Sequence, residues 1–398
     1  MGDAFEAIVG AAHVERPAAL CLAGARVAAV VRPADAPELA ACLRASSELG
    51  MAIVAYGGGT RQHFGNPLDA RECVRLELGR IAAHIDVDAD EGIATLDAGV
   101  RIGALAARVA ACGKTSLLAD LGPAGTVGGA LAADPFGPDW TLDQRLRNEV
   151  LGVEIALANG ELASAGGRVV KNVTGFDLVR LYCGSLGTLG VLTRATVRLR
   201  AVPECERIVA ARFPSLDAGI EAFARAALSA RPGAAALRLD RSGVELLCRF
   251  SGDEKAVELQ AARMPGVSAP LESWLRLRAE LASPPAVGRA RARLSARPSD
   301  VAVLCRAAAE AAGENALRVV FPLAGAVVAE VDDAELPRLA TVAADLDALL
   351  FAERAPGAGP SPCDVFGSPP SSLELMRAVK ARFDPRRVLA PGRFVGGI

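Results

Sequence analysis

The stretch that decides the fold runs from Val54 to Pro67 and reads VAYGGGTRQHFGNP, an apolar segment that leads directly into three consecutive glycines and a threonine. Glycine has no Cβ, so glycines in a row suit a backbone that turns sharply or comes close to a ligand. Successive backbone N–H groups in such a loop form a concave site for an anion. The stretch therefore predicts a strand followed by a phosphate-binding loop.

Length and composition limit the function classes. The chain has 398 residues, of which 52% are hydrophobic and 23% charged, and its net charge is -2. This predicts a globular protein with at least two domains. Acidic residues alternate with the arginines, so we expect no nucleic-acid partner. The sequence has no signal-peptide pattern and no run of about eighteen apolar residues. We therefore expect a cytoplasmic protein without direct membrane insertion, which reaches a membrane only through partners.

The cysteines and histidines argue against a metal site. Nine cysteines lie far apart and form no Cys-x-x-Cys pair of the kind that zinc and iron–sulfur sites use. We expect them to be reduced and buried. The histidines, His13, His63 and His84, all fall in the first quarter of the chain. No histidine cluster can form after His84, so the rest of the chain offers no imidazole as a metal ligand or a base.

Two local patterns predict a helix and a β-hairpin. Residues 36–50, APELAACLRASSELG, predict a helix that stops at Gly50. The segment VLGVEIALANGELASAGG predicts two strands joined at Asn159-Gly160, because this dipeptide is the strongest short hairpin signal.

Two more glycine-rich loops follow the first. LGPAGTVGGALAADPFGP covers residues 121–138, and in it Thr126 can cap a short helix that begins at Val127. The third loop, CGSLGTLGVLTRATVRL, begins at Cys183 and continues into a strand. Three such loops in one domain are more than turns alone require.

The composition changes near residue 204, where the glycine clusters stop. Segments from Ala235 and Asn315 repeat the pattern strand, turn, strand, acidic cap and helix, and a strand and helix precede each. Two βαββα units predict an antiparallel sheet covered by helices on one face. A linker rich in Pro, Gly and Ser then leads to an apolar tail that we expect to pack on the first domain. The predicted fold is α+β, with domains at 1–203, 204–355 and 356–398.

A Rossmann dinucleotide site is disfavoured. It needs Gly-x-Gly-x-x-Gly between a strand and a helix. Gly65, Asn66 and Pro67 break any helix after the first loop, and the third loop precedes a β-rich segment. Glycine loops at Gly57–Thr60 and Gly125–Gly129 instead predict a diphosphate held between two sets of N–H groups.

Several longer motifs occur together in a characteristic order: YGGGT, GTVGGALAAD, VLGVEIALANGE, GGRVVKNVTGFDLVRLYCGSLGTLGVLTRATVRL and FDPRRVLAPGRF. In these the chain resembles FAD-linked oxidases with the p-cresol methylhydroxylase/vanillyl-alcohol oxidase (PCMH-type) fold, and most of all the E-type FAD-binding subunits of bacterial glycolate oxidase. The resemblance is close over residues 36–202 and moderate in the tail. Between them it is limited to the arrangement of the expected helices and strands. It implies a PCMH-type FAD-binding domain of two α/β subdomains, and a cap domain.

The resemblance also implies which residues bind FAD. The first loop would wrap the pyrophosphate with Gly57, Gly58, Gly59, Thr60, Arg61 and Gln62. The other two loops would contact the flavin with Thr126, Val127, Gly128, Gly129, Asp134, Gly184, Ser185, Gly187, Thr188, Gly190 and Val191. Lys171, Asn172 and Asp177 would hold the flavin or the seam between domains, and the alternatives are a surface lysine and a helix-capping aspartate.

Four positions need separate comment. Asp134 stands where many relatives have Asn, and Ala390-Pro391-Gly392 replaces Asn-Pro-Gly; both differences fall where the flavin ring and substrate would lie. His63 follows the glycine turn, whereas relatives with a histidyl link carry their histidine within it, so we expect non-covalent FAD. Arg393 is expected to be a solvated tail arginine, with an anionic partner or substrate as the alternative.

The resemblance also bears on function. Catalytic relatives carry a late His-x-Gly-Asp-Gly-Asn-x-His segment, which this chain lacks. This implies an FAD-binding subunit of a multi-subunit glycolate (2-hydroxy acid) oxidase or dehydrogenase, with a D-type catalytic FAD subunit and an iron–sulfur subunit as partners at the inner membrane. Its own flavin would be structural or relay electrons. One alternative is a self-sufficient oxidase of a small hydroxy acid or alcohol, with Tyr182, Glu154 or Asp364 as the base. The other is a non-catalytic scaffold.

Overall fold

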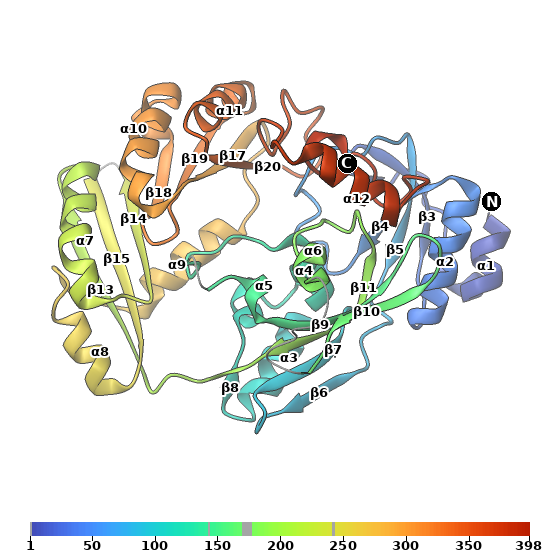
Figure 1. Cartoon of the computed structure of the whole chain (residues 1–398), viewed down its shortest axis with the longest axis horizontal. Coiled ribbons are helices and arrows are strands. Elements are labelled where there is room, and N and C mark those ends of the chain that lie inside the picture. The colour runs from blue at the N-terminus through green and yellow to red at the C-terminus, as the bar shows by residue number, and fades with distance from the viewer. Residues whose placement is uncertain (1, 142–143, 169–176, 241–242) are drawn as a thin grey trace.

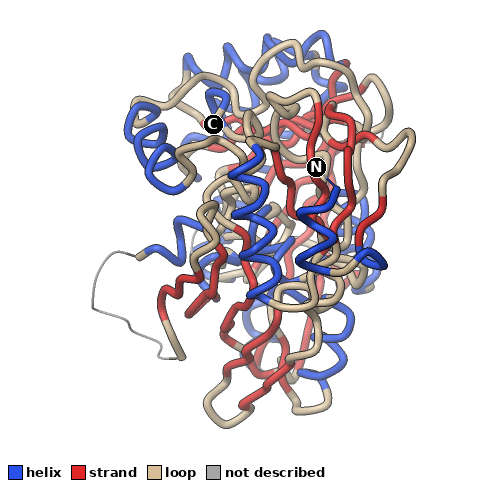
Figure 2. Tube along the Cα trace, turned by 90° about the vertical axis from the view of Figure 1, so that its right-hand side faces the viewer, coloured by secondary structure: helices blue, strands red, loops and turns tan. Residues whose placement is uncertain are grey.

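A computed structural model of the chain describes residues 2–141, 144–168, 177–240 and 243–398. The molecule has two lobes that lie side by side (Figure 1). We call the part built from residues 2–202 the N-terminal lobe and the part built from residues 205–354 the cap lobe. The chain returns to the N-terminal lobe through α12 (Leu373–Phe383), and Figure 2 shows the molecule from that side, with both chain ends in view.

The first sheet of the N-terminal lobe has a parallel centre, in which β5 lies between β3 and β4. The helix predicted over residues 36–50 is confirmed as α2. The Asp35 side chain caps α2 by accepting a hydrogen bond from the N–H of Glu38, and Gly50 ends it with φ of 64°. The elements of this part are α1 (Gly2–Val9), β1 (Val14–Glu15), β2 (Cys21–Leu22), β3 (Ala25–Val31), α2 (Ala36–Leu49), β4 (Ala52–Tyr56) and β5 (Glu72–Glu77).

The second sheet of the N-terminal lobe is antiparallel, in the order β10-β9-β11-β7-β6. The predicted hairpin at Asn159-Gly160 is confirmed, because β9 and β10 pair on either side of it. The elements here are β6 (Ile85–Asp88), β7 (Ile93–Asp97), α3 (Ile102–Ala110), β8 (Lys114–Thr115), α4 (Val127–Ala133), α5 (Leu146–Glu149), β9 (Val150–Ala156), β10 (Leu162–Gly166), α6 (Leu178–Tyr182), β11 (Val191–Arg198) and β12 (Arg200–Ala201).

The cap lobe holds one antiparallel sheet in the order β16-β13-β15-β14-β18-β19-β17-β20. The two predicted βαββα units are present, and their inner strands β14 and β18 pair where the units meet. The first unit is β13 (Cys205–Phe213), α7 (Leu216–Ala230), β14 (Ala234–Asp240), β15 (Gly243–Gly252) and α8 (Glu254–Ala261). The second is β17 (Arg289–Ser295), α10 (Val301–Ala312), β18 (Leu317–Phe321), β19 (Ala326–Asp332) and α11 (Leu336–Asp345). Between and after the units lie β16 (Val267–Ala269), α9 (Leu271–Ala282) and β20 (Leu349–Arg354).

Side chains of the cap sheet alternate between two apolar clusters, as strand geometry requires. Leu246 and Cys248 face the cluster that α7, α8, α10 and α11 cover, whereas Leu247 faces the other side, with Trp274 of α9. Phe136 of the N-terminal lobe packs there too. The prediction of helices on one face is therefore incomplete, because α9 lies between the sheet and the N-terminal lobe (Figure 1).

The C-terminal tail lies along β4, the strand that leads into the first glycine loop. The N–H of Ile53 donates to the carbonyl oxygen of Val388 at 2.7 Å, and the N–H of Ala390 donates to that of Ile53 at 2.9 Å. Val388 and Leu389 are buried in the core of the N-terminal lobe. The tail thus supports the first glycine loop from one side.

Candidate functional site

The first glycine loop follows β4, and residues 57–71 contain no helix or strand. Within the described parts of the chain, the backbone N–H groups from Gly57 to His63 donate to no protein acceptor. Most buried backbone N–H groups in proteins are paired, so a partly buried row of free donors is suited to the oxygens of an anion. The prediction that no Rossmann helix follows this loop is confirmed.

The first loop packs directly against the second. A Cβ on Gly57 would collide with the Thr126 side chain, and a Cβ on Gly58 would collide with the carbonyl oxygen of Ala124. Gly59 has φ of 74°, which residues with a Cβ rarely adopt. The close approach of the two loops therefore requires glycine at positions 57 and 58, and the backbone turn requires it at position 59.

The second loop uses its own N–H groups within the protein. Thr126 caps α4 as predicted, because its hydroxyl accepts a hydrogen bond from the N–H of Gly129 at 3.3 Å. The N–H groups of Val127 and Gly128 donate to backbone carbonyl oxygens at 3.0 and 2.8 Å. The expectation that both loops offer their N–H groups to a diphosphate is therefore wrong for the start of α4.

The third loop is held by hydroxyl groups and by α12. The Ser185 hydroxyl donates to the carbonyl oxygen of Tyr182, and the Thr188 hydroxyl donates to that of Ser185. Lys380 of α12 donates from Nζ to the carbonyl oxygen of Thr188 at 2.8 Å and to Asp384 Oδ2 at 2.7 Å. Burial lowers the pKa of Lys380, and Asp384 opposes that shift. The predicted contact residues Ser185 and Thr188 thus have a structural role in this loop.

The three loops border one cleft with about 780 Å³ of space between its atoms, part of it open to solvent. The predicted site residues that line it are Gly57, Gly58, Gly59, Thr60, Arg61, Gln62, Thr126, Gly128, Gly129, Gly187, Gly190 and Val191. The predicted residues outside its lining are Val127, Asp134, Gly184, Ser185 and Thr188. Lys171 and Asn172 lie outside the described residues, and Asp177 caps α6 by accepting a hydrogen bond from the N–H of Arg180.

Two arginines bring positive charge to the cleft without a carboxylate partner among the described residues. Arg61 donates to the carbonyl oxygen of Leu121 at 3.1 Å, and burial lowers its pKa. Arg393 also lines the cleft. Its guanidinium donates to the carbonyl oxygens of Gln62, Phe64 and Asn66 in the first loop. Burial lowers the pKa of Arg393 to about 10. The expectation of a solvated Arg393 is wrong. Its side chain packs against the first loop, and Arg393 is only 5% exposed.

Asp134 lies where the second and third loops meet. It ends α4 with φ of 40°, an unusual value for a residue other than glycine. A Cβ on Gly184 would lie 3.4 Å from the Asp134 Cβ, so the third loop passes directly over this side chain. Burial raises the pKa of Asp134, and Arg147, Arg293 and Arg145 oppose the shift. Asp134 Oδ1 is buried and has no hydrogen-bond partner.

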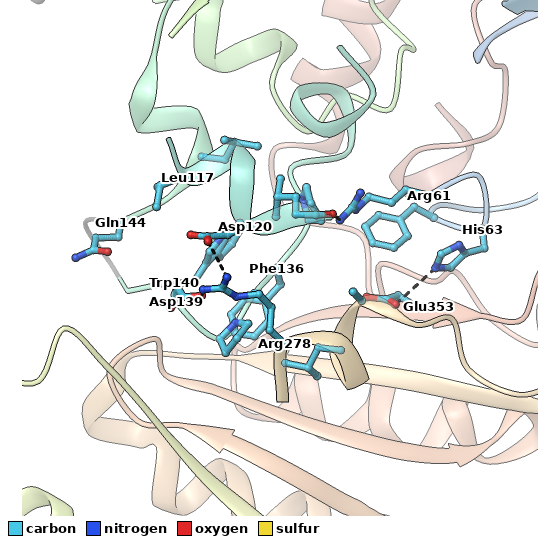
Figure 3. Close-up of a pocket in the computed structure, with 18 residues that line it drawn as sticks. Arg61, His63, Leu117, Asp120, Phe136, Asp139, Trp140, Gln144, Arg278 and Glu353 are labelled. Carbon is cyan, nitrogen blue, oxygen red and sulfur yellow. Dashed lines mark hydrogen bonds and ion pairs between the residues drawn. The ribbon is translucent and has the colours of Figure 1, made fainter. Parts of the chain in front are cut away.

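A second pocket lies at the boundary between the lobes (Figure 3). On one side, Arg278 of α9 bridges Asp120 and Asp139 with hydrogen bonds of 2.7 Å each. On the other side, His63 Nε2 lies 3.7 Å from Glu353 Oε2 of β20. Arg61 lines both this pocket and the glycine cleft, so the two spaces are neighbours.

None of the three bases considered from the sequence lines either space. Tyr182 is buried at 3% exposure, and burial raises its pKa. The Glu154 side chain is 51% exposed and faces Arg194. Asp364 accepts hydrogen bonds from Asn66 Nδ2 and from two backbone N–H groups. The self-sufficient alternative therefore needs a different base.

Sequence reasoning missed the cap residues that face the N-terminal lobe. Arg291 and Arg293 of β17 and Glu353 of β20 share this face of the sheet, opposite the buried alanines Ala290 and Ala292. The alternation in RARARLS carried that signal, because arginines at every second position of a strand share one face.

The cysteines and potential metal ligands give a mixed outcome. Cys21 and Cys112 are exposed, so burial of all the cysteines was wrong. Over the residues that the structure describes, no group of at least three His, Cys, Asp or Glu side chains is arranged to hold a metal ion. Over the same residues, no helix has the length and hydropathy to cross a membrane.

Comparison with protein families identifies the fold. Residues 27–166 match the family described as "FAD binding domain", and residues 368–394 match "FAD linked oxidases, C-terminal domain". Two separate parts of the chain thus match families of FAD-binding and FAD-linked proteins. Both descriptions name FAD, which confirms the cofactor expected from the motifs. The predicted α+β fold with a PCMH-type domain and an antiparallel cap sheet is also confirmed.

Similar proteins are FAD-linked oxidoreductases. D-lactate dehydrogenase from Archaeoglobus fulgidus is 30% identical over 56% of this chain and 50% of its own length. Glycolate oxidase subunit GlcD from Bacillus subtilis is 29% identical over 48% of this chain and 41% of its own. Glycolate oxidase subunit GlcE from Escherichia coli is 27% identical over 57% of this chain and 63% of its own.

The chain spans about half the length of the curated relatives that it matches. A solved structure of alkyldihydroxyacetonephosphate synthase is similar over 92% of this chain and 76% of its own, with a TM-score of 0.63 and 15% identity. At that identity the likeness shows the shared fold.

Proposed function

We propose that this chain is the FAD-binding subunit of a multi-subunit glycolate (2-hydroxy acid) oxidase or dehydrogenase. The observation that carries the proposal is the row of free N–H groups from Gly57 to His63, together with Arg61 and Arg393. A pyrophosphate supplies the oxygen atoms and the negative charge that these groups lack. The free N–H groups and the two arginines therefore both fit the pyrophosphate of FAD.

In this proposal the residues of the first loop bind the pyrophosphate of a non-covalent FAD. The glycines would let the backbone approach, Arg61 and Arg393 would neutralise charge, and the third loop would border the rest of the cofactor with Gly187 and Gly190. His63 ends the row of donors and faces Glu353, which favours a loop histidine over a covalent link. When bound, FAD supplies an acceptor for two electrons. The domain division at 1–203, 204–355 and 356–398 belongs to the proposal.

The partners are inferred from what the chain lacks. The cap has no histidine, so a D-type catalytic FAD subunit would supply the base and an iron–sulfur subunit would carry electrons away. Binding to these two subunits would bring this cytoplasmic chain to the inner membrane. Similarity to both GlcD and GlcE supports this class of complex.

A second candidate is an oxidase of a small hydroxy acid that acts without partners. A specific observation favours keeping it: Oδ1 of Asp134 is buried and has no hydrogen-bond partner, at the junction of two loops. A non-catalytic scaffold without cofactor is the third alternative, and the unpaired charge of Arg61 and Arg393 argues against it.

One purification distinguishes the candidates. We expect a tagged chain, expressed in its native cells, to show a flavin absorbance band, to release the flavin on acid precipitation and to co-purify with two partner subunits. Absence of flavin would contradict the proposal and favour the scaffold. Turnover of glycolate by the isolated chain with an artificial acceptor would favour the self-sufficient oxidase.

A further inference from the structure

The Asn66 side chain, near the end of the first glycine loop, joins two segments from the far end of the chain. Its Nδ2 donates to Asp364 Oδ1 at 2.9 Å and to the carbonyl oxygen of Phe394 at 3.2 Å. Its Oδ1 accepts a hydrogen bond from the N–H of Val365 at 3.0 Å. Asp364 and Phe394 lie 298 and 328 residues further along the sequence, in the linker and in the tail.

Asp364 lies at the centre of these contacts. Besides Asn66, its Oδ1 accepts a hydrogen bond from the N–H of Phe366 at 2.9 Å. Its Oδ2 accepts one from the N–H of Gly396 at 2.7 Å. Hydrogen bonds to an ionised carboxylate are stronger than those between neutral groups. One carboxylate thus fastens the first loop, the linker and the tail to one another.

Aromatic rings surround the same junction. The ring of Phe64 in the first loop lies 5.2 Å from that of Phe351 in β20, measured between centroids. Phe366 of the linker lies 5.3 Å from Phe351 and 5.0 Å from Phe394 of the tail. A hydrogen bond is electrostatically stronger where water is excluded. The cap strand β20 therefore supports the junction that Asp364 forms.

The junction lies next to the groups that make the first loop suited to an anion. The free N–H groups end at His63, three residues before Asn66. The N–H of Asn66 donates to the carbonyl oxygen of Arg393 at 3.0 Å, and the Arg393 guanidinium donates back to the loop. A shift of Asn66 would therefore move both the row of donors and the arginine.

We infer that Asp364 is a positioning residue for FAD binding, which couples the binding of FAD by the first loop to the docking of the tail. Asp364 does not line the glycine cleft, so it acts through Asn66 and the tail. Coupling between two binding events is reciprocal, so FAD should also hold the tail in place. The inference rests on the proposed function for the placement of the pyrophosphate on the first loop.

The test is a titration of the full-length apoprotein with FAD. We expect Asp364→Ala to raise the Kd for FAD roughly 10- to 100-fold, because three charge-assisted hydrogen bonds are lost. Asp364→Asn has the same shape and keeps one acceptor oxygen. It should recover part of the affinity, and it provides the same comparison if the alanine variant does not fold.

The matched control is Asp35→Ala. This change also removes a carboxylate that accepts a hydrogen bond from a backbone N–H, at the start of α2, and Asp35 does not line the cleft. Urea denaturation should show a loss of stability in both alanine variants, whereas only Asp364→Ala should weaken FAD binding. An equal rise in Kd for Asp35→Ala would mean that general destabilisation, and not positioning, weakens the site.

Amide hydrogen exchange measures the coupling in the reverse direction. In the unmodified chain we expect FAD to slow exchange of the Gly396 amide roughly tenfold, because opening of the tail would release the bond to Asp364. In Asp364→Ala this effect of FAD should be absent.

Each outcome has one meaning. An unchanged Kd for FAD in Asp364→Ala would overturn the inference, as would equal exchange of the Gly396 amide with and without FAD. In both cases the unmodified chain still binds FAD, so the proposed function stands. An unmodified chain that binds no FAD would overturn the proposed function together with the inference.

Discussion

The first and second glycine loops look alike in sequence but use their backbone donors differently. From Gly57 to His63, within the described chain, the N–H groups have no protein acceptor, whereas those of Val127, Gly128 and Gly129 are all paired internally. The first loop is therefore built to bind, and the second is built to pack against it. Glycine content alone does not separate these roles, because both a ligand and a neighbouring loop require close backbone approach.

The substitution Gly58→Ala is the strongest test of how the first loop packs against the second. The added Cβ would collide with the carbonyl oxygen of Ala124, and backbone atoms cannot move aside cheaply. We expect the two loops to separate, FAD binding to be lost and the free energy of unfolding to fall. Flavin content and urea denaturation measure both effects.

The matched control is Gly79→Ala, because a Cβ on Gly79 meets no atom within 4 Å. It should retain flavin and stability. Full flavin content in Gly58→Ala would mean that the first loop is not held against the second in the way the structure shows.

Arg393→Met tests whether the first loop needs its cation. The change removes a buried guanidinium and its three hydrogen bonds to the carbonyl oxygens of that loop. We expect the Kd for FAD to rise roughly 10- to 100-fold, since hydrogen bonds to a charged group contribute about 1.5–3 kcal/mol. Titration of the apoprotein with FAD measures it.

Arg386→Met is the matched control, because Arg386 lies in the same tail, is exposed and donates to the carbonyl oxygen of Ser47. An unchanged Kd in Arg393→Met would show that the positive charge of the cleft is not directed at the cofactor.

Local structure was predictable where short-range signals act alone. Gly50 ended α2 as expected, Asn159-Gly160 joined β9 and β10, and Thr126 capped α4. Each depends on backbone geometry that neighbouring residues determine. The repeat of the cap lobe was visible for the same reason.

Contacts between distant segments could not be predicted in this way. The sequence places Arg393 in a tail, but in the fold it lies within the first loop, because the tail pairs with β4. Asp139 accepts hydrogen bonds from Arg249, Trp274 and Arg278 across the boundary between the lobes. Such pairs depend on the packing of whole lobes, and neither partner carries a local signal.

Thr126→Val addresses the structural role of the second loop. It removes the hydroxyl that accepts from the N–H of Gly129 while nearly keeping the side-chain volume. We expect a loss of about 1 kcal/mol in the free energy of unfolding, the usual contribution of an N-cap. Thr126→Ser keeps the hydroxyl, so it should retain most of the free energy of unfolding that Thr126→Val loses. Urea denaturation measures the change, and a greater effect on FAD affinity than on stability would assign the second loop a binding role.

Asp134→Asn tests the junction of the second and third loops through pH. Because burial raises the pKa of Asp134 in the folded state, the folded protein holds this proton more tightly than the unfolded chain does. The free energy of unfolding of the unmodified protein therefore falls as pH rises from the ordinary aspartate value of 3.8 to the raised folded pKa. Asn has no such charge, so the variant should be more stable at neutral pH and its advantage should vanish below that window. Urea denaturation across pH measures the difference, and a constant difference at all pH values would show that the Asp134 charge is fully compensated, which would remove the electrostatic reason for a ligand at this junction.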